Sequence, residues 1–146
     1  MGSVNSEATH KFVIVLNEKS PIGKLLSATG QLALLLLYQA KPEQQSAMDF
    51  ISFLNPNNQE LISLSSLSFV TLKSTNNQLL TLYSKTRGAG VLSAIFTSTM
   101  SFNGIEENLM QKTASTPLDQ VEIYGVGIFG KIEEITPLTK KFSLFK

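Results

Sequence analysis

Short apolar runs that do not alternate with polar residues recur along the chain. The clearest is Lys-Phe-Val-Ile-Val-Leu-Asn at residues 11–17, and such a run is typical of a central strand covered on both faces. Further strands are expected at residues 68–73, 91–97, 121–127 and 142–145. Two shorter runs, 50–54 and 61–64, flank the turn-forming sequence Asn-Pro-Asn-Asn and predict a β-hairpin.

Helical periodicity is strongest over residues 21–40. Ser20 followed by Pro21 predicts an N-cap and a proline at the first helical position. The second half of this helix is hydrophobic nearly all round, because Leu34, Leu35 and Tyr38 lie opposite its main apolar face. We therefore expect that half to be buried or to meet another subunit.

The remaining helices are expected to be shorter. Thr75 with Gln78 forms a capping-box pattern, and Gly88 and Gly90 should end the helix it opens. Asn103 with Glu106 could cap a short helix through Met110. Another is expected at residues 132–136, ended by Pro137, whereas residues 43–47 and 98–103 are expected to be loops.

Strands and helices alternate along this order, which favours an α/β fold. We expect a mixed, mostly parallel sheet of about four to five strands, flanked by helices and carrying the extra hairpin. Residues 1–10 are polar and are interpreted as a flexible leader, and residues 11–146 as one domain. A chain of 146 residues is long enough for a sizeable core.

Composition narrows the classes of function. The formal net charge is +1, so no broad electrostatic field is available to hold a nucleic-acid backbone. Cysteine is absent and His10 is the only histidine, which excludes disulfides, thiolate sites and multi-histidine metal sites. We expect no metal and no cofactor. The sequence has neither an apolar run long enough for a bilayer nor a secretory signal, so we expect a cytoplasmic protein without a membrane partner.

Several segments resemble the type 2 peptidyl-tRNA hydrolases. The apolar strand at residues 11–17, followed by Gly23-Lys24 at a helix start, is similar to that family's first strand and helix. Residues 68–88 resemble its second strand and helix, residues 91–97 its third strand, and residues 125–145 its last strand, short helix and tail. The resemblance implies a peptidyl-tRNA hydrolase II-like fold.

A closer resemblance is to an uncharacterised family, domain of unknown function 2000. Its members share the Gly-Lys helix start and carry strand-like segments similar to residues 49–64. Their loop after the third strand resembles residues 96–103, and their ending resembles residues 126–145. The resemblance covers residues 11 to 145.

The hydrolase resemblance points to a lysine at a helix start and an aspartate after the third strand. Lys24 matches the lysine, and a cation at a helix N-terminus is electrostatically unfavourable for stability. It either binds an anion or is a solvated surface lysine. The aspartate position falls on Thr97, so the carboxylate of the family pattern is missing.

Small polar residues surround that position. We expect ligand-binding candidates among six residues: Gly23, Lys24, Thr97, Ser98, Thr99 and Ser101. Their hydroxyls either contact a phosphate or simply cap the end of a strand. Gly23 either allows a ligand close to free helix N–H groups or serves only the turn. Phe102 either stacks on a ligand or anchors its loop.

Other candidates have simpler explanations. Gly125, Gly127 and Gly130 are more typical of close packing or a bulge than of a dinucleotide loop. The pairs Glu106-Glu107 and Glu133-Glu134 are interpreted as solvated faces. Lys140 and Lys141 could join Lys24 in one basic rim.

Three functions remain open. The favoured one is a non-catalytic or unknown-activity relative of the hydrolases that binds a small anionic or nucleotide-like ligand. The second is a divergent peptidyl-tRNA hydrolase or esterase, for which tRNA would be a partner, although the lost acid and low charge disfavour it. The third is a homo-oligomeric interaction module, and we expect a homodimer, which is compatible with each of the three. The sequence leaves open whether the protein is an enzyme.

Overall fold

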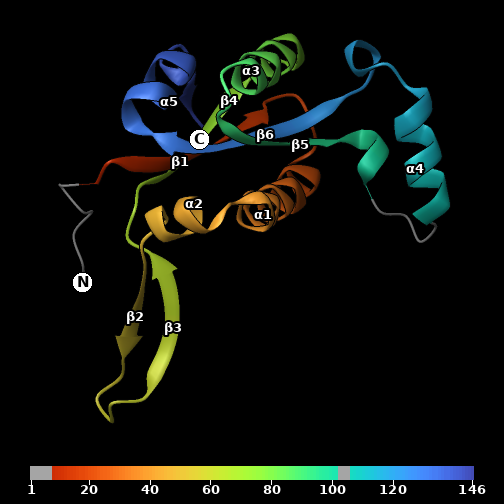
Figure 1. Cartoon of the computed structure of the whole chain (residues 1–146). Helices are drawn as coiled ribbons and strands as arrows, with labels where there is room; N and C mark the ends of the chain where they lie inside the picture. The colour runs from red at the N-terminus through yellow and green to blue at the C-terminus, as the bar shows by residue number, and fades with distance from the viewer. Residues whose placement is uncertain (1–7, 102–105) are drawn as a thin grey trace.

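The computed structural model describes residues 8–101 and 106–146. Their centre is a five-stranded sheet in the order β5-β6-β1-β4-β7, with helices on both faces (Figure 1). The strands are β1 (His10–Asn17), β4 (Phe69–Ser74), β5 (Leu92–Thr97), β6 (Ile123–Lys131) and β7 (Ser143–Leu144). The α/β class and the mixed sheet are confirmed.

The expectation of a mostly parallel sheet is wrong. Within the described residues, only β1 and β4 pair in parallel, and the pairs β1–β6, β5–β6 and β4–β7 are antiparallel. The connection from β5 to β6 explains the error. It contains α4 (Glu106–Ser115), which lies beyond the end of the sheet in Figure 1 rather than crossing a face. The chain therefore returns to the sheet at the same edge at which β5 ends. As a result, β6 runs antiparallel to β5 and lies between β5 and β1.

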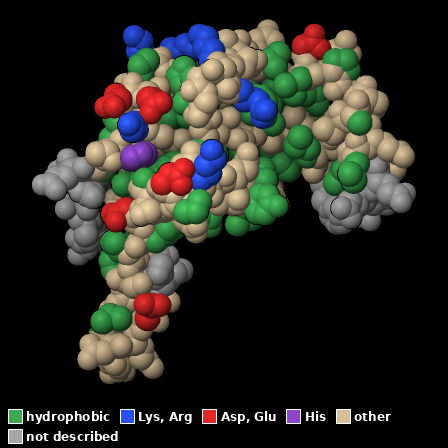
Figure 2. Space-filling model, viewed as in Figure 1, with side chains coloured by type: hydrophobic (Ala, Val, Ile, Leu, Met, Phe, Trp, Pro, Cys, Tyr) green, Lys and Arg blue, Asp and Glu red, His purple; other side chains and the backbone are tan. Residues whose placement is uncertain are grey.

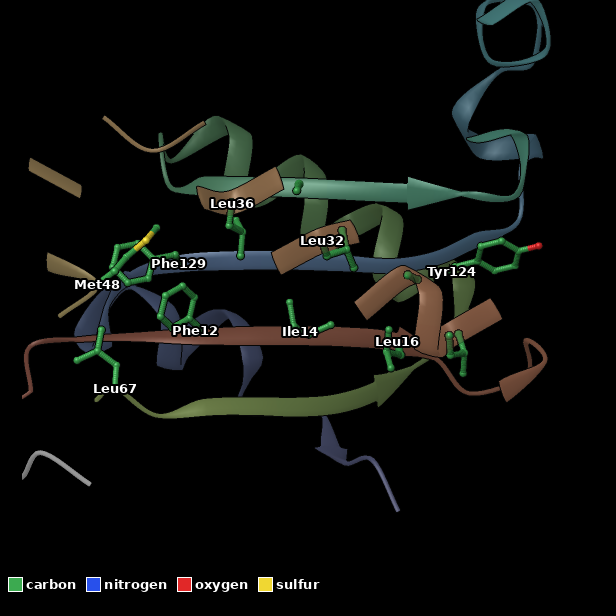
Figure 3. Close-up of a cluster of buried hydrophobic side chains, with 12 residues drawn as sticks. Phe12, Ile14, Leu16, Leu32, Leu36, Met48, Leu67, Tyr124 and Phe129 are labelled. Carbon is green, nitrogen blue, oxygen red and sulfur yellow. The ribbon is translucent and has the colours of Figure 1, made fainter. Parts of the chain in front are cut away.

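Two hydrophobic clusters lie on opposite faces of the sheet. Phe12, Ile14 and Leu16 of β1 pack with the buried side of α1 (Ile22–Gln39), as Figure 3 shows. The alternate residues Val13 and Val15 pack toward the other cluster, which includes side chains of α3 (Asn76–Gly88) and α5 (Ile132–Thr139). The prediction of a first strand covered on both faces is therefore confirmed.

The predicted hairpin is also confirmed. β2 (Phe50–Leu54) and β3 (Glu60–Ser65) form a separate antiparallel two-stranded sheet. In Figure 1 this ribbon projects away from the five-stranded sheet on the side covered by α1. We call the ribbon, residues 50–65, the arm.

One helix start and one predicted loop need correction. α1 begins at Ile22 with Pro21 as its N-cap residue, and the Ser20 hydroxyl donates to Glu122 instead of capping the helix. Residues 43–47, expected as a loop, belong to α2 (Pro42–Ala47). Pro42 ends one helix but also suits the first position of the next, where the missing N–H is not needed.

Helix and strand ends differ from expectation elsewhere. β6 continues four residues beyond the predicted Gly127, because both of its edges remain paired, with Lys131 opposite His10 and Phe129 opposite Leu92. His10 is thus a strand residue and not part of a leader. α5 runs through Pro137 to Thr139, and α4 runs to Ser115 rather than Met110.

The start of α3 agrees with prediction, whereas two short 3-10 helices were not expected. Thr75 caps α3 as expected, since its hydroxyl accepts the Gln78 N–H and the Gln78 side chain accepts the Thr75 N–H. Residues 98–100 form a short 3-10 helix, η1 (Ser98–Met100), in place of a loop, and Leu118–Gln120 forms another, η2. Residues 1–7 of the predicted leader, the proposed cap Asn103 and Phe102 lie outside the described residues.

Candidate functional site

The first turn of α1 and the segment after β5 meet at one edge of the sheet. β1 and β5 run in the same direction, because each pairs antiparallel with β6. Their carboxyl ends therefore lie at the same edge, which is where ligands bind in many α/β sheets. The Lys24 Nζ donates to the Ser101 Oγ at 3.0 Å across this edge. Two of the six residues predicted from sequence are thus in direct contact.

A groove of about 490 Å³ surrounds this contact. Its polar lining comes mainly from α1, and its apolar lining from β5, η1 and α4. The lining residues are Lys24, Ser27, Gln31, Phe96, Met100, Ser101 and Leu109. The groove thus has a cation and amide and hydroxyl groups on one side, and an aromatic ring with aliphatic chains on the other. No carboxylate is among these lining residues.

The N-terminus of α1 adds donors at the same end. The first turn has no acidic residue and no side-chain cap. The N–H groups of Lys24 and Leu25 bond to the Pro21 carbonyl, whereas those of Ile22 and Gly23 have no acceptor among the described residues. Such free N–H groups favour an anion.

Gly23 has no packing role in the structure. A Cβ at this position would have no heavy atom within 4 Å, apart from its own helix and chain neighbours. Its backbone is exposed at the helix start. The alternative in which Gly23 leaves room for an approaching ligand is therefore compatible with its surroundings.

Three of the six predicted residues do not line the groove: Thr97, Ser98 and Thr99. Their contacts instead hold together the elements that form its walls. Thr97 is buried, and its hydroxyl is 2.8 Å from that of Thr99. The Thr113 hydroxyl of α4 donates to Thr99 at 3.0 Å. The Ser98 N–H donates to the Glu122 carbonyl at 2.8 Å. These contacts tie the end of β5 to α4 and to the residue before β6.

A carboxylate at this edge was missed by the sequence analysis. Glu122 directly precedes β6, and its carboxylate accepts the Ser20 hydroxyl at 2.6 Å. Burial, and then the charge of Glu122, raise the pKa of Tyr124 above its usual value. No local sequence motif marks Glu122, because its hydrogen-bond partner Ser20 lies 102 residues away along the chain.

A second polar cluster holds the ends of β1, α3 and β6 together. The Asn17 Nδ2 donates to the Ile123 carbonyl at 3.0 Å and to the Asn76 Oδ1 at 3.2 Å. Asn76 in turn accepts the Ile123 N–H at 2.7 Å and donates to the Val121 carbonyl at 3.1 Å. A cleft of about 410 Å³ adjoins the cluster. Since both amides are satisfied by the protein, we assign this cluster a structural role.

The glycines of β6 serve close packing, as one of the sequence alternatives proposed. A Cβ on Gly125 would lie 2.9 Å from the Leu16 Cδ2 and 3.0 Å from the Val15 carbonyl oxygen. On Gly127 it would lie 3.1 Å from Ile14 and 3.3 Å from Leu32. These distances show that β6 needs glycine so that α1 can lie close to it.

The proposed basic rim is not supported by the sheet order. Lys24 contacts the segment after β5, whereas Lys140 and Lys141 precede β7. These two strands are opposite edges of the sheet, with β6, β1 and β4 between them. Glu133 and Glu134 are exposed, in agreement with a solvated face, while the side chains of Glu106 and Glu107 lie outside the described part.

No group of three acidic or histidine side chains within residues 8–101 and 106–146 is placed to hold a metal ion. Of the helices in this same part of the chain, none combines the length and the apolar character that a membrane crossing requires.

Comparisons with known proteins place the chain in a family. No curated protein matches it. Among solved structures it is similar to the protein of unknown function Atu0240 from Agrobacterium tumefaciens, with 13% identity and a TM-score of 0.78 over 94% of this chain and 98% of that one. At this identity the likeness shows the fold alone. The model of the family of proteins of unknown function DUF2000 matches residues 10–146, and the chain therefore belongs to that family.

Proposed function

We propose that the protein binds a small anionic ligand in the groove between α1, β5 and α4. The observation that carries this proposal is the position of Lys24, a cation in the first turn of a helix with a hydroxyl as its contact and no carboxylate among the described residues that line the groove. A lysine here is unfavourable for the helix by about 0.3–1 kcal/mol. Its charge is therefore available to a phosphate or carboxylate group.

The opposite wall of the groove narrows the ligand class. Phe96, Met100 and Leu109 offer an apolar surface of a size suited to a flat ring or an aliphatic chain. A ligand with an anionic group beside an apolar body, such as a nucleoside monophosphate or an N-acyl amino acid, would satisfy both walls. Inorganic phosphate alone would contact only the polar wall that carries Lys24.

A thermal-shift screen followed by calorimetric titration tests the proposal. The probes are inorganic phosphate, AMP and N-acetyl-leucine, each in millimolar excess. Ligand at about 100 times Kd raises the free energy of unfolding by about 2.7 kcal/mol. Lys24→Ala should weaken binding of the stabilising probe about tenfold or more, because a charge-assisted hydrogen bond is lost.

Two controls sharpen this experiment. Lys140→Ala removes the same charge at the opposite edge of the sheet and should leave the affinity unchanged. Without ligand, the free energy of unfolding of Lys24→Ala should equal that of the wild type or exceed it by up to about 0.5 kcal/mol. The reason is that the unfavourable charge at the helix end has been removed. Failure of every probe to stabilise the wild type would contradict the proposal.

A divergent peptidyl-tRNA hydrolase is the second candidate. What supports it is the order of strands and helices expected from the resemblance, together with the Lys24–Ser101 contact. Against it, Thr97 at the family's acid position is buried and bonded to Thr99. Hydrolysis of peptidyl-tRNA by the wild type and its loss in Lys24→Ala would favour this candidate. No turnover by the wild type would eliminate it.

A further inference from the structure

The outer face of α1 is apolar and uncovered. Ile22, Leu26, Leu34 and Tyr38 are spread over about 160° of the helix circumference, on the half that faces away from the buried residues of α1. Leu34 is 63% exposed and Tyr38 87% exposed. Leu35, which the sequence analysis grouped with them, instead packs partly buried against the core. Lys24 is the only charged residue in the helix.

The arm is apolar and uncovered as well. Ile51 and Leu64 are opposite each other in the ladder, so their side chains share one face of the ribbon. Both are exposed, and so are Phe50, Leu54 and Leu61. A two-stranded ribbon is marginally stable alone in water. Among the described elements, β2 and β3 have substantial contacts only with each other.

The arm projects from the same side of the sheet as the one that α1 covers (Figure 1). Figure 2 shows it standing clear of the body. Residues 50–65 contain a single charged residue, Glu60. Depletion of charge in an apolar patch is typical of the centre of a protein interface.

We propose that the occupant of both surfaces is a second copy of this chain. In a two-fold dimer the arm of each copy lies on α1 of the other, so each contact is made twice. This arrangement covers, on one molecule, both the apolar face of α1 and that of the arm. A single unrelated partner would have to match a helix face and a ribbon face at once.

The exposed area is sufficient for such a dimer. With on the order of 200 Å² for a fully exposed side chain of this size, the α1 face offers about 550 Å² and the arm about 500 Å². If only one face of the arm is covered, each copy still buries about 800 Å², which is the area per partner of a standard interface. Each surface is by itself comparable in area with the largest apolar patch of a typical monomer, about 300–600 Å².

Sedimentation velocity at concentrations from about 5 to about 50 µM is the first test, since a standard-size interface gives micromolar or tighter affinity. The wild type should sediment as a dimer. Leu34→Glu on α1 and Leu64→Lys on the arm should each give a monomer. Ser84→Glu, at an exposed position of α3 on the other side of the sheet, is the matched control and should remain a dimer.

Mixing the two variants tests the exchange of arms directly. In a mixed dimer, one contact between arm and helix pairs the two introduced side chains, whose charges are opposite, and the other contact is unaltered. Leu34→Glu and Leu64→Lys mixed in equal amounts should therefore dimerise, although neither does so alone. Far-UV circular dichroism confirms that each variant is folded.

Three results would overturn the proposal. A monomeric wild type removes it altogether. If both charged variants remain dimeric, the dimer interface lies elsewhere on the surface. A dimer lost in Leu34→Glu but kept in Leu64→Lys joins α1 to α1 without the arm.

Discussion

Asn76 joins three elements through one amide side chain. It contacts Asn17 at the end of β1, the Val121 carbonyl and the Ile123 N–H at the start of β6. Asn76→Ala would remove the partners of the Val121 carbonyl and the Ile123 N–H, while Asn17 would keep its bond to the Ile123 carbonyl, and an unsatisfied buried group costs about 1–3 kcal/mol. We expect the free energy of unfolding in urea to fall by about 2–4 kcal/mol. Asn77→Ala, on the exposed neighbouring residue, should change it by less than about 0.5 kcal/mol.

Tyr124 should make the folded protein sensitive to alkali. Burial, and then the Glu122 carboxylate, raise the pKa of Tyr124 in the folded state, so the folded protein holds the phenolic proton more tightly than the unfolded chain does. The resulting stabilisation is complete below the unfolded pKa of about 10 and is lost as the pH rises through the folded value. Tyr124→Phe should therefore lose less stability than the wild type between about pH 9 and about pH 11.

Urea unfolding at several pH values measures this difference, and phenolate absorbance follows the titration of the tyrosines. Equal slopes of stability against pH in the two proteins would show that Tyr124 has an ordinary pKa. Glu122→Gln should lower the folded pKa of Tyr124 partway, because only the smaller of its two causes is removed.

At the scale of elements, the contact between α1 and β6 depends on two glycines. A methyl group on Gly125 would meet the Val15 carbonyl, which belongs to the central strand and has little room to move. Gly125→Ala should therefore cost about 1–3 kcal/mol by overpacking. Gly88→Ala, where the added carbon meets nothing within 4 Å, should be neutral or slightly stabilising. Thermal and urea unfolding compare the two substitutions, and equal losses would contradict this account.

At the scale of the whole molecule, the proposed dimer links stability to concentration. If only the dimer is fully packed, the Tm should rise by several degrees as the protein concentration increases about a hundredfold. Leu34→Glu should show a Tm that is lower and independent of concentration. A wild-type Tm that does not change with concentration would mean that the arm and α1 are stable without a second copy.

The sequence by itself determined the elements whose signals are local. The apolar run of β1, the turn between β2 and β3, and the capping box of α3 each lie within a few neighbouring residues, and each was predicted correctly. The position of Lys24 at the start of a helix was also predicted correctly, and its role in binding stays a prediction. Local chemistry was sufficient in these cases because the partners of each residue are close along the chain.

Only the tertiary structure decided the direction of β6 and the composition of the site. An alternating order of strands and helices does not say whether α4 crosses a face of the sheet. Because α4 does not cross a face, β6 runs antiparallel to β5 and β1 rather than parallel to them. The contacts of Lys24 with Ser101, of Ser20 with Glu122 and of Asn17 with Ile123 each join residues more than seventy positions apart. Such contacts depend on which strand ends share an edge, a property of the assembled sheet that no local pattern encodes.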